Sequence, residues 1–103
     1  ATGAMLRAGA DECATGENAV IFNAKWAHVL MGPIGVLTPN GLLGEVSAAM
    51  AGAIGGSEAV KILLPSQRCS IRLAVGEPRP LQAYLDEAVN LLDKELRRLE
   101  NEA

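Results

Sequence analysis

The chain has 103 residues and a net charge of −3, and half of its residues are hydrophobic although only three are aromatic. This length fits a single domain whose core is built from Ala, Val, Leu and Ile. The acidic balance argues against a nucleic-acid partner, which needs a dense Lys and Arg surface, and no apolar run reaches the roughly 18 residues that cross a membrane.

A helix-forming run opens the chain. Ala1–Ala8 predicts the end of a helix that stops at Gly9, because glycine accepts the positive φ of a helix C-terminal cap. No capping residue precedes this run and no initiator Met begins it, and the sheet predicted below would have few strands. We therefore expect residues 1–103 to be one α/β domain of a gene product that is longer at its N-terminus.

The next element is a helix or a strand. Thr15 places a hydroxyl before Glu17, as at a helix N-cap, whereas Val20-Ile21-Phe22 taken alone favours a strand. A parallel crossover to the following strand needs about a dozen residues, and only Asn23–Ala27 are available. We predict a short helix from Gly16 to about Ala24, with an antiparallel hairpin as the alternative.

Two continuous apolar runs predict parallel strands that are buried on both faces. They are His28–Met31, ended by Gly32-Pro33, and Val60–Leu64, ended by Pro65. Between them, the apolar spacing over Gly41–Gly55 gives one helical face. The strand, helix and strand would form a right-handed βαβ unit.

Two polar residues of this unit are expected to have structural roles. His28 is the only histidine and begins the first strand, away from its carboxyl end, so we expect it to be buried and hydrogen-bonded rather than catalytic. Ser47 lies inside the predicted helix and can cap one of its turns.

The last third of the chain predicts an edge strand and a long helix. Hydrophobic residues alternate over Ile71–Val75, and the five residues Ser66–Ser70 are too few for a parallel crossover, so we expect an antiparallel edge hairpin. Leucines then recur at helical spacing over Leu81–Glu100, with acidic residues early and Arg97-Arg98 late, an order that complements the helix macrodipole. These elements predict an α/β fold of the Rossmann-like three-layer kind, with a mainly parallel sheet, an antiparallel edge hairpin and a long C-terminal helix.

Ligands of such sheets bind at the carboxyl ends of the strands. The first strand is followed by Gly32 and Gly35 and then by Asn40 and Gly41, whose backbone amides can approach an anion closely. Glu45 is a carboxylate that would face the same cleft. Packing alone is the alternative explanation for the glycines, and solvation is the alternative for the glutamate.

The second strand is followed by Ser66, Gln67, Arg68 and Cys69. Arg68 can bind a phosphate or a carboxylate, although exposed loops are often polar without a ligand. Cys69 has no neighbouring base to activate it, and the two cysteines, Cys13 and Cys69, form no zinc-site spacing. We therefore expect a reducing, cytoplasmic location and no metal site. The sequence does not identify a cofactor. The predicted ligand-binding residues are Gly32, Gly35, Asn40, Gly41, Glu45 and Arg68.

Several blocks of the sequence resemble, in the same order, a family of small bacterial proteins described as a domain of unknown function. The blocks are Met5–Ala10, Ala14–Ala19, Gly32–Gly35, Leu43–Glu45 and Lys61–Pro65. The resemblance implies a Rossmann-like fold and supplies no catalytic residues. Members of that family begin earlier, with a strand, a glycine-rich turn and a helix that resemble a dinucleotide or phosphate loop, a segment that this sequence lacks. Residues 27–65 are also similar to sugar-phosphate isomerases related to ribose isomerase and an initiation factor.

Three functions follow as hypotheses. The first is a binding domain for an anionic small molecule, either a nucleotide or a phosphorylated metabolite. The second is a sugar-phosphate isomerase that uses Glu45 as its base near the Asn40-Gly41 turn. The third is an interaction protein that forms a homo-oligomer through the C-terminal helix, about 30 Å long, with Leu92, Leu96 and Leu99 partly exposed. Alternatively, this helix lies across the sheet and frays at its end.

Overall fold

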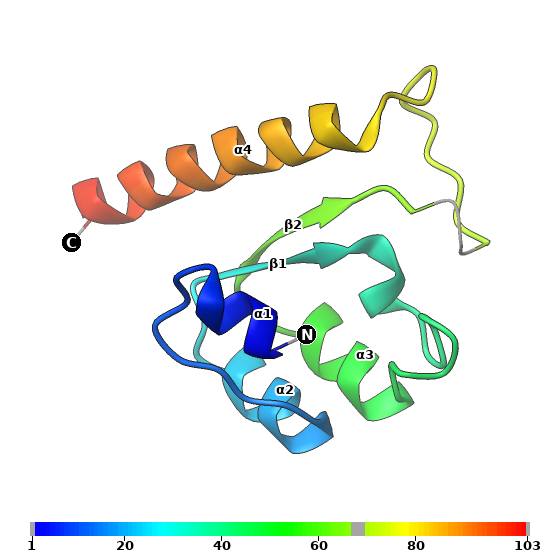
Figure 1. Cartoon of the computed structure of the whole chain (residues 1–103), viewed down its shortest axis with the longest axis vertical. Helices are drawn as coiled ribbons and strands as arrows, with labels where there is room; N and C mark the ends of the chain where they lie inside the picture. Colours follow the sequence, from blue (N-terminus) through cyan, green and yellow to red (C-terminus); the bar gives the residue numbers. More distant parts are fainter. Residues whose placement is uncertain (1, 67–69, 103) are drawn as a thin grey trace.

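A computed structural model describes residues 2–66 and 70–102. These residues form a mixed helix and strand structure with a parallel two-stranded sheet and a long C-terminal helix. In chain order the elements are α1 (Thr2–Arg7), α2 (Glu17–Ala24), β1 (Val29–Pro33), the 3-10 helix η1 (Ile34–Leu37), α3 (Ala48–Gly55), β2 (Val60–Leu64) and α4 (Leu81–Glu102). The helix α4 packs against β2, whereas α3 packs against α2 and η1, on the other side of the strands in Figure 1. None of the described helices is long and apolar enough to cross a membrane.

The two strands confirm the predicted parallel pair with a helix between them. They align from Val29 opposite Val60 to Pro33 opposite Leu64, and a proline follows or ends each apolar run. The prediction that both faces are buried is wrong. Ile62 is 5% exposed, but its neighbour Met31 is 47% exposed, because the described sheet has only two strands and α4 packs mainly on β2.

The core is small and made mainly of alanine. The buried hydrophobic residues are Ala24, Val46, Ala51, Ala59, Ile62 and Ala88. Alanine lets helix and strand backbones come close together, and this explains how α2 and α3 pack through Ala24 and Ala51. Larger apolar side chains lie mostly nearer the surface, including Phe22 and Trp26, whose rings meet edge to face and are each 61% exposed.

The two N-terminal helices occur where the sequence predicts them. The helix α1 ends before Gly9, which has a φ of +115° as a C-terminal cap requires. The helix α2 confirms the short helix and excludes the alternative hairpin. Its N-cap is Gly16, and the expected Thr15 cap is wrong, because the Thr15 hydroxyl donates to the Thr2 hydroxyl over 3.2 Å instead.

The helix α3 is shorter than predicted. It begins at Ala48, after Ser47, whose hydroxyl accepts a 3.1 Å hydrogen bond from the Met50 amide. The residues before Ser47 cannot be helical, because Leu42 and Leu43 have φ values of 53° and 58°, in the left-handed region. Ser47 therefore caps the start of the helix and not a turn inside it.

The predicted edge strand is wrong. Among the described residues after β2, Ile71–Val75 have no strand structure. Ile71, Leu73 and Val75 line an open pocket, and Arg72 between them lines it too, so this segment does not place alternate side chains on opposite faces as a strand would. The residues of the expected hairpin turn, 67–69, lie outside the described residues.

His28 also differs from its prediction. It is exposed, and its carbonyl accepts a 3.1 Å hydrogen bond from the Val60 amide.

The long helix α4 is confirmed, but its charges act differently from the prediction. The described first turn has no acidic residue and the last turn no basic one, and the macrodipole acts only within those turns. The arginines instead pair along the helix, Arg97 with Asp93 over 3.0 Å and Arg98 with both Glu95 and Glu102 over 2.9 Å. Glu95 and Glu102 raise the pKa of the Arg98 guanidinium by these hydrogen bonds.

Candidate functional site

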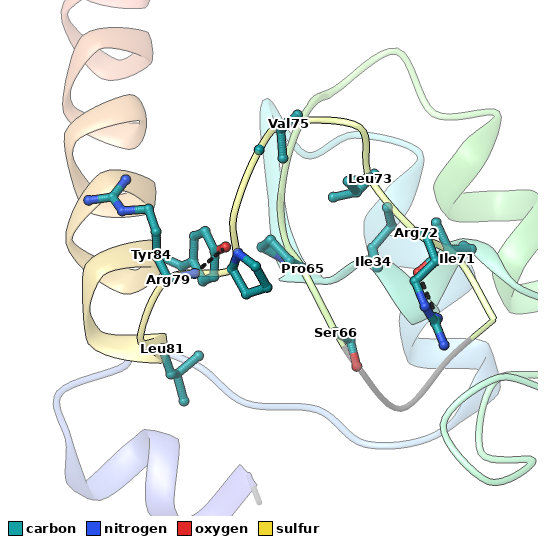
Figure 2. Close-up of a pocket in the computed structure, with 12 residues that line it drawn as sticks. Ile34, Pro65, Ser66, Ile71, Arg72, Leu73, Val75, Arg79, Leu81 and Tyr84 are labelled. Atoms are coloured by element: carbon teal, nitrogen blue, oxygen red, sulfur yellow. Dashed lines mark hydrogen bonds between the residues drawn. The ribbon is translucent and has the colours of Figure 1, made fainter.

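An open pocket of about 660 Å³ lies where the two parallel strands end (Figure 2). Ile34 follows β1 directly, and Pro65 and Ser66 follow β2 directly, so both carboxyl ends contribute to its wall. The loop from Ile71 to Arg79 and the first turn of α4 form the remaining walls. The pocket therefore occupies the place in a parallel sheet where ligands bind.

The polar groups of this pocket are cationic or neutral. Arg72 and Arg79 both line it, on opposite sides in Figure 2, and among the described lining residues there is no aspartate or glutamate. Arg72 donates from Nη1 to the Ile71 carbonyl over 3.2 Å. The charged residues of the described lining are therefore positive, whereas the net charge of the chain is −3. A positive lining favours an anion over a cation as ligand.

Tyr84 connects the pocket to α4. Its hydroxyl accepts a 2.9 Å hydrogen bond from the Arg79 amide, and its ring lies 6.0 Å from the Arg79 guanidinium carbon. These two contacts join the end of the loop to the first turn of the helix. Figure 2 shows the Arg79 guanidinium beside the helix, directed away from Pro65 and Ile34.

A family model described as "Domain of unknown function (DUF3842)" matches residues 1–97. The chain belongs to this family. No curated protein and no solved structure matches the chain. The resemblance to a domain-of-unknown-function family is thus confirmed, and the site of this DUF3842 domain has to be interpreted from its own residues.

The predicted glycines lie in β1 or after it, none of them is a described lining residue of the pocket, and Gly35 and Gly41 pack closely against each other. Gly32 is in β1 and is half-buried, and Gly35 is buried in η1. The Gly41 amide donates to the Thr38 carbonyl over 2.8 Å, and a methyl group at position 41 would lie only 2.5 Å from the Gly35 carbonyl oxygen. Close packing of the loop on itself thus requires Gly41, and anion binding by these glycines stays a prediction.

Asn40 and Glu45 are also outside the described pocket wall. Asn40 is exposed with a φ of 62°, and its amide donates to the Val46 carbonyl over 2.6 Å. Glu45 is exposed, and its amide donates to the Leu42 carbonyl over 3.2 Å. Arg68 lies outside the described residues. Nothing in the described geometry brings Glu45 to the pocket, and a ligand role for these residues stays a prediction.

Arg72, Arg79 and Tyr84 are the pocket residues that sequence reasoning missed. Arg72 falls on the expected solvent face of an edge strand, and Tyr84 falls in a helix. Their positions in the sequence could have indicated this, since both arginines lie between β2 and α4. That segment begins at the carboxyl end of β2, where the pocket lies. A search of every cation in that segment, and not of Arg68 alone, would have found them.

A second hollow of about 730 Å³ lies between α1 and α2 and has a different character. Asp11, Glu12 and Cys13 line it together with apolar side chains. The Cys13 thiol donates to the Thr2 carbonyl over 3.3 Å. Among the described residues no group of three or more His, Cys, Asp or Glu side chains is arranged to hold a metal ion, and this hollow is the weaker candidate.

Proposed function

We propose that the protein binds an anionic small molecule, a nucleotide or a phosphorylated metabolite, in the pocket at the carboxyl ends of β1 and β2. The observation that carries this proposal is the pair of arginines, Arg72 and Arg79, in a pocket wall whose described residues include no carboxylate. Arginine is suited to phosphate because its planar guanidinium donates two parallel hydrogen bonds. The first turn of α4 adds to this preference, since it lines the pocket and has no acidic residue near the positive end of the helix dipole.

The pocket has room and apolar surface for more than an inorganic anion. Its volume falls within the roughly 300–1,000 Å³ of small-molecule sites. Ile34, Ile71 and Leu73 supply apolar wall, with Arg72 beside them in Figure 2. Such a wall suits a base, a sugar carbon face or a short carbon chain attached to the phosphate.

We further interpret β1, α3 and β2 as part of a Rossmann-like sheet. The parallel pairing, the helix in the crossover and the pocket at the carboxyl edge all support this interpretation. The predicted loop then has an indirect role, since Gly35 and Gly41 fix the turn that holds Ile34 at the wall. The cytoplasm, where phosphorylated metabolites are abundant, remains the expected location.

The test measures binding of ADP, ribose 5-phosphate and inorganic phosphate by calorimetry and by thermal shift. A phosphorylated compound at a hundred times its Kd should stabilise the fold by about 2.7 kcal/mol. Arg72→Ala and Arg79→Ala should each weaken that binding by roughly tenfold or more, since a charged hydrogen bond contributes about 1.5 to 3 kcal/mol.

The matched control is Arg7→Ala, which removes an exposed arginine of α1 far from the pocket in the chain. It should leave the Kd unchanged. Arg79→Lys, which keeps the charge but not the paired donors, should weaken binding less than Arg79→Ala. If no phosphorylated compound binds, or if Arg7→Ala weakens binding as much as the pocket variants, the proposal is wrong.

A further inference from the structure

The helix α4 has an apolar face that the described part of the chain covers only in part. Ala88 is buried against the rest of the molecule, whereas Val89 is 61% exposed, Leu96 47% and Leu85 37%. Leu92, between them, is half-buried. In Figure 1, α4 lies alone on its side of the strands. A continuous stripe of apolar side chains therefore runs along the outer part of the helix.

The spacing of this stripe is symmetric. Leu85, Val89, Leu92 and Leu96 are separated by four, three and four residues, so the pattern reads the same from either end. Spacings of three and four residues keep the side chains on one face of a helix. If an identical helix lies against it in the opposite direction, Leu85 of one copy meets Leu96 of the other, and Val89 meets Leu92. Such side-chain pairing is the geometry of an antiparallel coiled coil.

The charges beside the stripe have the same symmetry. Asp86 and Arg97 are eleven residues apart, close to three helical turns, so they lie on one flank of the stripe. In the antiparallel arrangement each Asp86 comes close to Arg97 of the other copy, twice in the pair. Arg97 is bonded to Asp93 of its own helix, but both side chains are more than half exposed and can accept a further partner. In a parallel arrangement, Asp86 would instead meet Asp86.

We propose that two copies of this chain pair through α4, antiparallel and around a two-fold axis that passes midway between Val89 and Leu92. The apolar stripe supplies the contact, and the Asp86 and Arg97 pairs set the direction. Because the interface consists of one helix from each copy, the dimer is expected to dissociate on dilution. This inference does not rest on the ligand pocket, and either can fail without the other.

The first test is the mass of the full chain in solution. Sedimentation equilibrium should give twice the 10.7 kDa of one chain at high protein concentration and should approach the single mass on dilution. Val89→Glu places a charge in the centre of the stripe and should weaken the dimer by roughly tenfold or more. Its matched control is Asn90→Glu, which adds the same charge at the next, exposed position outside the stripe and should leave the dimer unchanged.

The second test examines direction. Asp86→Arg and Arg97→Asp should each weaken the homodimer, since like charges then face each other. An equimolar mixture of the two variants should restore pairing, because both Arg–Asp contacts re-form between the unlike chains. Circular dichroism of each variant shows whether α4 is intact. A chain that stays monomeric at the highest concentration, a dimer equally insensitive to Val89→Glu and Asn90→Glu, or a mixture that fails to associate would each overturn the proposal.

Discussion

Two segments leave the same edge of the sheet, and they use their residues in different ways. After β1, the backbone bonds to itself: Thr38 donates to Gly35 over 3.1 Å, Gly41 to Thr38 over 2.8 Å, and Val46 to Gly41 over 3.1 Å. After β2, the described residues 72–80 are all exposed, and most of them line the pocket. A glycine-rich loop at a strand end therefore does not by itself mark a ligand site, because its amides can be occupied within the loop.

The largest effect is expected in the segment after β1. Gly41→Ala should destabilise the fold by roughly 3 kcal/mol, because its methyl group would lie 2.5 Å and 2.8 Å from the backbone oxygens of Gly35 and Thr38. The measurement is urea unfolding. Gly52→Ala in α3 is the control, since no heavy atom lies within 4 Å of that position, and it should stabilise by about 0.5–1 kcal/mol. Equal effects of the two variants would mean that the loop is not tightly packed.

A smaller effect is expected where this segment enters α3. Ser47→Ala should cost about 1 kcal/mol, since it removes the hydroxyl that accepts the Met50 amide. The same hydroxyl donates to the Glu17 carboxylate and so joins the starts of α3 and α2. Ser47→Thr retains a hydroxyl and should recover most of the stability in the same unfolding assay. Identical losses for the two variants would exclude the cap as their cause.

Backbone strain offers a finer comparison of the two segments. Leu43 is fully exposed and has a φ of 58°, so Leu43→Asn should stabilise the fold by roughly 0.5 kcal/mol, because asparagine adopts this conformation more readily. Val75, which is 75% exposed in the pocket segment, is not among the described residues with positive φ. Val75→Asn should therefore not raise the midpoint of urea unfolding. A gain at both sites would indicate a general effect of removing exposed apolar surface.

The smallest effect is expected in the pocket itself. Arg72→Ala should change the free energy of unfolding by no more than about 0.5 kcal/mol, because the residue is exposed and lies outside helices and strands. Thermal and urea unfolding of this variant beside the wild type measure the difference. A loss as large as that of Ser47→Ala would show that the pocket segment is a structural element and not mainly a ligand surface.

Local signals predicted most of the helices and strands. Proline after an apolar run located the ends of β1 and β2, and leucine spacing located α4. The start of α3 was predicted too early, because an apolar period continues through Leu42 and Leu43 although their backbone is left-handed. Periodicity describes where side chains repeat and contains no information on φ.

The site was harder to predict, for a related reason. The carboxyl edge of the sheet was identified correctly as a place for a pocket, but the alternation over Ile71–Val75 was interpreted as a strand. Alternation shows only that a segment could place every second side chain on one face of a sheet, and it does not show whether a partner strand is present. In the structure Arg72 lines the pocket together with Ile71 and Leu73. The sequence does not show that Arg72 and Arg79 line one pocket, because this depends on where α4 begins and on the hydrogen bond between the Arg79 amide and Tyr84.

The alanine-rich core has a consequence for the thermodynamics of unfolding. The chain exposes 7639 Å² of surface, whereas a compact folded monomer of this mass exposes about 5,500 Å². Less apolar surface is therefore left to become hydrated when the chain unfolds. The heat-capacity change on unfolding should then fall below the roughly 1.2–1.5 kcal/mol/K that is usual for a domain of about 100 residues. A low heat-capacity change flattens the stability curve, so the isolated chain should melt over a wide range of temperature and lose little stability on cooling.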